Sequence, residues 1–361
     1  MPNTGVLKNL RRVDLSLCDE ANSFLQSGFW GRFKSRFGWE AHSFCLDWVI
    51  NKDETLYETK TLLLLRRKFL PGFSMIYIPW GPELPASFPD SDYEAAITEL
   101  SLVLKENLPK DTVFLRFDLP WLSCDKPFFF SSRLKRSLVD IQVPDTVILD
   151  LTQPIESLKL KMKAKWRYNA GLAIKKGVKV KLSGVQNIDT FYKLLEITSS
   201  RDGLFIHEIN YYKTIFECLS KTILSIPEIF KTKIDLRLYI AEFEENPLAC
   251  IIILLWKKEA IYLYGASSNE NRNLMASYAL QMKAIEDAKE FGCETYDLFG
   301  IPPEDNPSNP MSGLYLFKTG FGGSIYHRPG CYDYPCKNFL YFLYQKIEFL
   351  RKKIMNFKKK R

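Results

Sequence analysis

One lysine, Lys318, lies in a segment whose neighbours suit acyl transfer. It follows Phe317 and is enclosed by glycines and aromatic residues over Gly313–Gly323. When an amine attacks an acyl ester, the tetrahedral intermediate carries a negative oxygen, and a fixed cation beside that oxygen lowers the barrier. An aromatic neighbour can shield the cation from water, and glycines let the backbone approach closely. We therefore interpret Lys318 as a transfer-site cation; the alternative is an ordinary surface lysine at a strand end.

The elements that would position Lys318 lie within residues 262–323. The sequence predicts a strand that ends near Gly265, a polar turn, a helix over Ser277–Phe291 and a short strand over Thr295–Leu298 before the glycine-rich segment. This order is typical of an acyl-transfer site at the end of a small mixed sheet.

Strands and helices also mix in the rest of the chain, whose 361 residues suffice for about two domains. The predicted fold class is α/β (α+β), with mixed sheets flanked by helices in each half, over residues 1–150 and 151–325. We expect one long helix over Glu156–Lys176, a short helix with an aromatic face within Phe24–Trp39, and a closing helix over Asn338–Lys353.

Basic residues gather between Leu158 and Leu182, where nine lysines and arginines occur without an acid. Such blocks attract polyanions by releasing their counterions. Trp166 and Tyr168 lie between the cations and suit base stacking, although they equally suit a helix that packs one face inward. We interpret the block as a contact for RNA or phosphates. The residues that we expect to bind the RNA are Lys163, Lys165, Arg167, Lys175 and Lys176.

A second basic cluster, Arg351–Lys353 and Lys358–Arg361, suits a solvated tail or a weak contact with a membrane surface. The longest apolar runs are strand-sized, well short of a membrane span, and we see no charged-then-apolar export signal. We therefore expect the eight cysteines to be reduced thiols in the cytoplasm. Three scattered histidines argue against a His-rich metal site.

Several short motifs, each weak alone, occur in one order along nearly the whole chain. In this order the chain resembles the FemABX-type peptidyltransferases, which use aminoacyl-tRNA to build peptidoglycan interpeptide bridges. The motifs are Leu25-Gln26-Ser27, Arg116-Phe117-Asp118-Leu119-Pro120, Ile148-Leu149-Asp150-Leu151, Arg167-Tyr168-Asn169, Arg201-Asp202-Gly203, Tyr211-Tyr212 and the block Tyr262–Gly323.

The resemblance implies two tandem GNAT-like domains with a cleft between them. The first domain would bind the acceptor and take back the C-terminal segment, so that it comprises residues 1–150 plus 328–361. The second, residues 151–327, would hold the transfer site and the tRNA side. The chain has no heptad stretch long enough for a coiled-coil arm and therefore resembles the short, armless form.

The resemblance also assigns roles to single residues. Phe317 and Lys318 match the transfer-site pair. Asp118 matches an aspartate that lines the acceptor site, where it could orient the attacking amine or take its proton; capping a turn or pairing with Arg116 is an equal alternative. Lys34 matches the lysine that holds the substrate diphosphate, a role that suits a compact charge, against the alternative of a solvated helix residue.

A second phosphate contact is implied near residues 201–212. His207 stands where many family members have arginine, so this contact would lose its charge above neutral pH. Tyr211 could hydrogen-bond the same phosphates or pack in the core. Tyr262 and Tyr264 lie two residues apart on one strand, so alternation predicts a shared face; Tyr264, nearer the strand end, is the expected substrate contact.

The turn over Asn271–Ala276 contains no glycine, and its side chains should obstruct the phosphate cradle that acyl-CoA needs. There is also no P-loop. The implied reaction moves an amino acid from aminoacyl-tRNA to the stem peptide of UDP-MurNAc-pentapeptide or lipid II, at the inner face of the cell membrane, with no metal or organic cofactor. The alternatives are a GNAT-like N-acyltransferase acting on a protein N-terminus or small amine, and a non-catalytic RNA-binding module.

Overall fold

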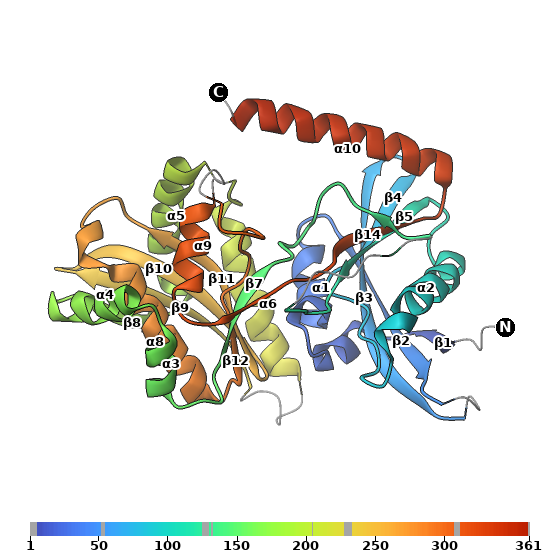
Figure 1. Ribbon diagram of the computed structural model, residues 1–361. Helices are drawn as coiled ribbons and strands as arrows, with labels where there is room; N and C mark the ends of the chain where they lie inside the picture. The colour runs from blue at the N-terminus through green and yellow to red at the C-terminus, as the bar shows by residue number, and fades with distance from the viewer. Residues whose placement is uncertain are drawn as a thin grey trace. The chain divides into compact units, whose positions relative to one another are not determined.

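The computed structural model describes residues 6–51, 55–124, 130, 133–203, 205–226, 233–306 and 311–359, with side chains to residue 353 in the last segment. The chain divides into two compact units, Met1–Gln142 with Arg328–Arg361, and Val143–His327 (Figure 1). The division falls before the boundary expected after residue 150, because the strand β7 (Thr146–Asp150) pairs within the second sheet.

The first unit is built on a mixed sheet of seven strands in the order β1-β2-β3-β4-β5-β14-β6. Strands β4 and β5 pair in parallel, and every other neighbouring pair is antiparallel. The strands are β1 (Leu7–Arg12), β2 (Glu40–Val49), β3 (Tyr57–Leu70), β4 (Phe73–Ile78), β5 (Thr112–Leu119), β6 (Lys135–Arg136) and β14 (Gly330–Pro335).

Helices cover both faces of the first sheet. On one face lies α2 (Tyr93–Asn107), whose Ile97, Leu100 and Leu104 recur at helical spacing and are fully buried against strand residues. On the other face α1 (Gly28–Ser35) packs against β2 and β3, and α10 (Asn338–Lys359) against β5. Short 3-10 helices precede α1 and α2; these are η1 (Leu15–Glu20), η2 (Phe24–Gln26) and η3 (Asp90–Asp92).

The second unit has a sheet of the same layout, in the order β13-β7-β12-β11-β10-β9-β8. Strands β11 and β12 are parallel, and the other neighbours are antiparallel. The remaining strands are β8 (Lys179–Ser183), β9 (Ile234–Phe243), β10 (Asn246–Trp256), β11 (Glu259–Ser267), β12 (Thr295–Asp297) and β13 (Ser324–Tyr326).

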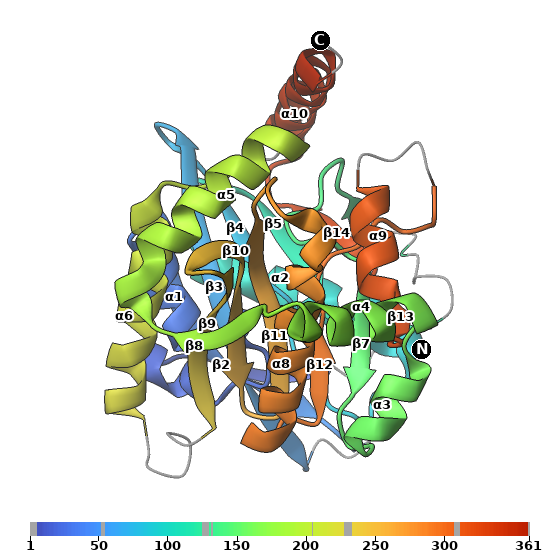
Figure 2. The ribbon, with the colours of Figure 1, turned by 90° about the vertical axis from the view of Figure 1, so that its left-hand side faces the viewer.

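The second sheet is also covered on both faces (Figure 2). Residues Ile251, Ile253 and Leu255 of β10 join the core beneath α8 (Ala276–Phe291), while α5 (Ile188–Asp202) packs on β10 and β11. A central strand buried on both faces reads as a continuous apolar run, and the run over residues 248–256 fits that position. The other helices are α3 (Ile155–Lys161), α4 (Ala164–Lys175), α6 (Ile209–Ser225) and α9 (Ser312–Thr319), with η4 (Val185–Asn187) and η5 (Arg272–Leu274).

The α/β class and the helix-flanked mixed sheets are confirmed, and three details of the prediction are wrong. The expected helix over Glu156–Lys176 is two helices, α3 and α4, because the backbone N–H of Lys163 donates to the carbonyl of Gly320 (2.9 Å) instead of continuing the first helix. The expected helix within Phe24–Trp39 is shorter, with η2 before α1. Lys318 lies on a helix, α9, where only a glycine-rich segment was expected. No described helix is long and apolar enough to cross a membrane.

Candidate active site

Lys318 lies in the last turn of α9 and is buried, with 5% of its surface exposed. Its Nζ donates hydrogen bonds to the carbonyl oxygens of Phe299 (2.8 Å) and Gly300 (2.9 Å), which follow β12. An ammonium group has three N–H donors, so these two bonds orient the third. The contacts exclude the interpretation as an ordinary surface lysine.

Burial in this position lowers the pKa of Lys318 to about 7, and the nearby Asp297 carboxyl opposes the shift. Asp297 is fully buried and accepts a hydrogen bond from the backbone N–H of Phe299 (2.7 Å) and another from the hydroxyl of Thr146. The lysine therefore changes charge near neutral pH, where an ordinary lysine would be fully protonated.

The aromatic ring beside the ammonium group belongs to Tyr262. The Nζ of Lys318 lies 5.3 Å from the centre of that ring, a cation–π distance. The ring of Phe317 packs instead edge-on against Tyr278 and Phe321. Phe317 thus supports the α9 segment through packing, and the aromatic partner of the cation is Tyr262, which was not predicted.

A tryptophan from the basic block fixes α9 in place. The indole Nε1 of Trp166 donates to the carbonyl of Phe317 (2.8 Å). A Cβ atom on Gly320 would lie 2.2 Å from the Trp166 ring, so only glycine fits there. Gly322 has a φ of +84°, a conformation that also favours glycine. Gly320 therefore lets α4 approach closely, and Gly322 does the same for the backbone of Lys161 at the end of α3.

Tyr262 and Tyr264 point to opposite faces of the second sheet, which corrects the expectation of a shared face. In the pairing with β10, Tyr264 opposes Ile252 and Tyr262 opposes Ile253, so Leu263 is an extra residue in β11. A bulge of this kind shifts the two-residue alternation by one. Tyr262 consequently joins the core that contains α8, and Tyr264 packs edge-on against Tyr212 of α6.

The residues expected to form the second phosphate contact lie together on that other face. The imidazole of His207 stacks on the ring of Tyr211, with 3.9 Å between ring centres. Burial raises the pKa of both Tyr211 and Tyr264, whose side chains interact. His207 is exposed while Tyr211 is buried. Of the three residues, His207 is therefore the most exposed and Tyr211 the least.

Lys34 lies in the last turn of α1 in the first unit. The hydroxyl of Ser27 accepts a hydrogen bond from the N–H of Trp30 (3.1 Å) and so begins the helix that carries the lysine. The Nζ lies 5.5 Å from the ring centre of Trp30 and 5.9 Å from that of Trp39. Burial, with a smaller effect of Arg67, lowers the pKa of Lys34 to about 8. This half-buried, aromatic-framed cation differs from a solvated helix residue.

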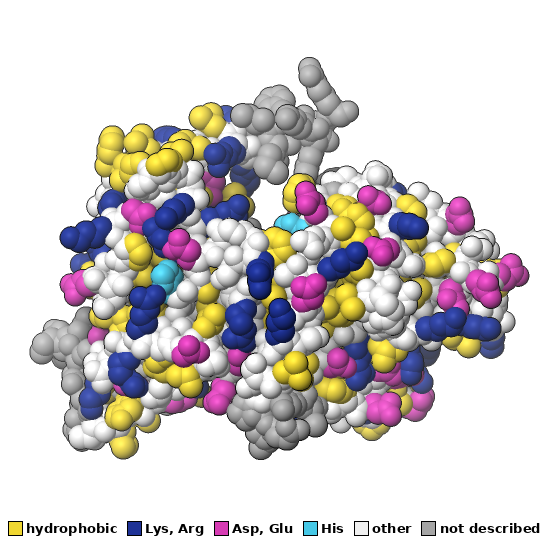
Figure 3. Space-filling model, turned by 180° about the vertical axis from the view of Figure 1, so that it is seen from behind, with side chains coloured by type: hydrophobic (Ala, Val, Ile, Leu, Met, Phe, Trp, Pro, Cys, Tyr) yellow, Lys and Arg dark blue, Asp and Glu magenta, His cyan; other side chains and the backbone are white. Residues whose placement is uncertain are grey.

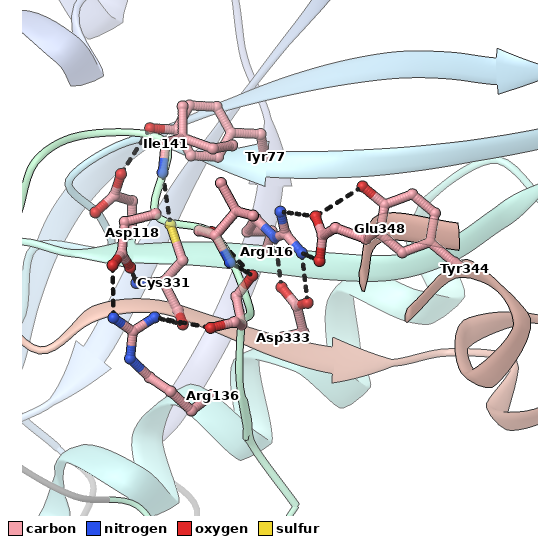
Figure 4. Close-up of polar contacts among 12 residues, drawn as sticks. Tyr77, Arg116, Asp118, Arg136, Ile141, Cys331, Asp333, Tyr344 and Glu348 are labelled. Atoms are coloured by element: carbon pink, nitrogen blue, oxygen red, sulfur yellow. Dashed lines mark hydrogen bonds and ion pairs between the residues drawn. The ribbon is translucent and has the colours of Figure 1, made fainter. Parts of the chain in front are cut away.

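Asp118 lies at the end of β5 in the first unit, with 1% of its surface exposed (Figure 4). Its Oδ2 accepts hydrogen bonds from the hydroxyl of Tyr77 (2.9 Å) and the N–H of Gln142 (3.0 Å). Oδ1 is buried and has no hydrogen-bond partner among the described residues. Burial raises the pKa of Asp118 to about 6. Arg116 pairs with Asp333 and Glu348 instead, which excludes the Arg116–Asp118 pair.

The basic block divides into structural and exposed residues. The guanidinium of Arg167 donates to the carbonyl of Lys159 (2.9 Å) and so caps α3, and Lys176 reaches the carbonyl of Asn273 (3.4 Å). Lys163, Lys165 and Lys175 have exposed side chains. Tyr168 is 65% exposed, whereas Trp166 is engaged with α9. Of the two aromatic residues, only Tyr168 remains open for stacking on a base.

In the turn before α8, backbone amides donate hydrogen bonds to carbonyl oxygens of the same turn. The N–H of Leu274 donates to the carbonyl of Asn271 (2.9 Å), and that of Met275 donates to Arg272 (3.2 Å). A phosphate cradle at a helix N-terminus needs such amides to point at the ligand. This turn is therefore unsuited to the pyrophosphate of acyl-CoA. Among the described residues, no group of three or more His, Cys, Asp or Glu side chains could hold a metal ion.

Comparison with known proteins identifies the family. A model of the FemAB family matches residues 134–246 and 225–349, more than half of the chain. The chain belongs to the FemAB family. The crystal structure of FemX covers 94% of this FemAB-family chain with a TM-score of 0.74 and 19% sequence identity. All of FemX is covered in that superposition, so the two proteins share their fold.

Curated relatives of this FemAB-family protein carry a functional name. The lipid II:glycine glycyltransferases of Staphylococcus epidermidis and Staphylococcus saprophyticus are each 25% identical to it over 260 residues, and that of Staphylococcus aureus is 23% identical over 265 residues. Each match covers 58% of this chain and 62% of the relative. The chain thus spans less than two thirds of the length of these relatives.

Proposed function

We propose that this FemAB-family protein is an aminoacyltransferase that moves an amino acid from aminoacyl-tRNA to the stem peptide of a peptidoglycan precursor. The family match and the names of the relatives support the class of reaction. The observation that carries the proposal is the buried ammonium group of Lys318, held by two backbone carbonyls beside Tyr262. UDP-MurNAc-pentapeptide and lipid II are the two acceptors that fit this proposal, with peripheral contact at the inner membrane face for the second.

The proposed reaction forms an amide bond and breaks an ester bond. The acceptor amine attacks the carbonyl carbon of the aminoacyl ester, and the carbonyl oxygen becomes negative. The third N–H of Lys318 would donate to this oxygen in the transition state. The intermediate then expels the ribose oxygen of the tRNA, which takes up the proton that the amine loses. The ester supplies the driving force, so the step needs no other reactant.

The roles of the other residues follow from their charge and burial. Lys34 would bind the diphosphate of the acceptor. An anion beside the lysine would raise its pKa, which burial lowers, and so would stabilise the ammonium form. Asp118, with its raised pKa, would accept the proton of the attacking amine and pass it on to the leaving ribose oxygen. Phe317 would hold the α9 segment. His207, Tyr211 and Tyr264 would form a second contact for the substrate phosphates.

The basic block would hold the donor RNA. Lys163, Lys165 and Lys175 would contact backbone phosphates, and Tyr168 would stack on a base. Arg167 and Lys176 would act mainly by fixing α3 and the turn before α8.

One experiment tests the function. The protein is incubated with tRNA charged with a labelled amino acid, with or without UDP-MurNAc-pentapeptide or lipid II, and the label is followed. Label in the muropeptide supports the proposal. Label on another amine without muropeptide supports an N-acyltransferase of different substrate. Binding of tRNA with no transfer to any acceptor supports a non-catalytic RNA-binding protein.

A further inference from the structure

The helix α10 packs against the first sheet along one side only. Tyr341 is buried, and its hydroxyl donates to Asp333 (3.0 Å). Glu348, nearly two turns further along, pairs with Arg116 of β5 (3.0 Å) (Figure 4). Arg116 is itself buried between Asp333 and Glu348, so these charges hold the helix on the sheet.

The opposite side of α10 is apolar and exposed. Its members recur three or four residues apart and therefore share the outward half of the helix. Hydrophobic side chains gather at the upper left of Figure 3, the side to which the turn brings the beginning of α10 from the upper right of Figure 1. The residues, with their exposed fractions, are Phe339 (71%), Phe342 (53%), Leu343 (42%), Ile347 (45%), Phe349 (44%) and Leu350 (57%).

The charged residues of α10 are almost all basic. Six lysines and arginines occur in the helix against one acid, Glu348, which is turned towards Arg116. The Nζ of Lys346 lies over the ring of Phe342 (5.1 Å), and that of Lys353 lies over the ring of Phe349 (4.8 Å). The described outward surface of α10 thus combines aromatic and aliphatic side chains with cations and includes no acid.

We propose that this outward face of α10 docks onto a lipid bilayer that contains anionic lipids. An amphipathic helix with a basic rim lies in the plane of the headgroups, with its apolar side chains in the acyl boundary and its lysines at the phosphates. A second copy of the chain is less favoured, because two such faces would bring like charges together. The inference deepens the proposed function: it places the protein at the surface that holds a lipid-linked acceptor.

Vesicle binding of the full chain tests the inference. The protein is sedimented with vesicles of phosphatidylcholine alone or of phosphatidylcholine with phosphatidylglycerol. We expect binding to the anionic vesicles, weaker at high salt. The double variant Leu343→Ser/Leu350→Ser should lower the affinity roughly tenfold or more, because it removes two side chains from the acyl boundary. The control Leu102→Ser/Leu224→Ser changes two other exposed leucines and should leave binding unchanged.

Three outcomes would overturn the inference. They are no binding to either vesicle, equal binding by the Leu343/Leu350 variant, and a dimer in sedimentation equilibrium that this variant dissociates, since the last would assign the face to a second copy. The transfer assay separates this inference from the proposed function. The variant should keep the rate with soluble UDP-MurNAc-pentapeptide and lose rate with lipid II in vesicles. If neither acceptor receives label, the proposed function fails while the vesicle result still stands.

Discussion

The two units share a sheet layout, and each buries an aspartate at the same place in it. Asp118 follows Phe117 on β5, the parallel partner of β4, and Asp297 follows Tyr296 on β12, the parallel partner of β11. Each carboxyl accepts one hydrogen bond from a hydroxyl and one from a backbone N–H. The donors are Tyr77 and Gln142 in the first unit, and Thr146 and Phe299 in the second. One scaffold position thus recurs in both halves.

The difference lies in the charge that accompanies each carboxyl. Asp297 has the buried ammonium of Lys318 nearby, and the lysine's pKa is lowered to about 7. Burial dominates at Asp118, over a weaker influence of Arg328, and raises its pKa to about 6. Burial thus lowers the pKa of the lysine beside one strand end, against the opposing effect of Asp297, and raises the pKa of the aspartate at the other strand end. The proposed reaction assigns the lysine to the oxyanion and the aspartate to the amine proton.

Removing the cation should have the largest effect. Lys318→Met should lower the transfer rate about 100- to 1000-fold, the cost of losing one oxyanion donor, with little change in the KM of either substrate. Because the folded state holds the Lys318 proton less tightly than the unfolded state, the variant should be at least as stable as wild type at pH 7. Initial rates and thermal unfolding measure both quantities.

The exposed Lys258→Met is the matched control in the same unit. It should keep the wild-type rate. If Lys318→Met transferred at the wild-type rate, the lysine would have no role in the reaction. The two units would then share only a structural feature.

Asp118→Asn should show how much stability the protein loses by burying an ionisable carboxyl at this position. The folded protein keeps this proton to about pH 6, whereas the unfolded chain loses it near pH 4. Stability of the wild type should therefore fall as pH rises between these values, on the order of 2–3 kcal/mol in total. The Asn variant lacks this loss and should gain stability relative to wild type above pH 6. Urea unfolding at pH 4 and pH 7 measures the difference; an equal difference at both would contradict the raised pKa.

The pH dependence of transfer tests which form of Lys318 acts. If the ammonium is required, kcat should fall about tenfold for each pH unit above 7, because the protonated fraction falls by that factor. The profile is measured with saturating substrates in one buffer series. A rate that rises through pH 7 would instead assign the neutral amine as a base, and the two units would then each hold a proton acceptor.

Lys34→Ala should have the smallest of these effects. Loss of one charge-assisted contact to the diphosphate should raise the KM of the acceptor about tenfold with kcat nearly unchanged. The exposed Arg36→Ala, two residues away, is the control for a change in surface charge. A fall in kcat at constant KM would place Lys34 in the chemical step instead.

Local signals in the sequence predicted much of the fold. The predicted helix over Ser277–Phe291 is α8 (Ala276–Phe291), and the predicted strand over Thr295–Leu298 is β12 (Thr295–Asp297). The closing helix was expected to end at Lys353 and runs to Lys359. The break between α3 and α4 could not be predicted, since it depends on a hydrogen bond from Lys163 to Gly320. The strand β14 was missed because its partner β5 lies far away in the sequence.

The candidate site divides in the same way. Lys318 was found from its glycines and aromatic neighbours, but its carbonyl partners at Phe299 and Gly300 come from another element. The contact between Tyr262 and Lys318 depends on the bulge at Leu263, and no residue type in that strand predicts a bulge. The recurrence of Phe117-Asp118-Leu119 as Tyr296-Asp297-Leu298 was a usable signal that the sequence analysis missed.

The position of β14 has a consequence for synthesis on the ribosome. This strand lies between β5 and β6 in the first sheet, yet the whole second unit precedes it in the chain. A nascent chain can therefore complete residues 143–327 while β5 still lacks its neighbour and presents an unpaired edge. The later-translated unit would therefore mature first, a reversal of the usual N-to-C order of domain folding.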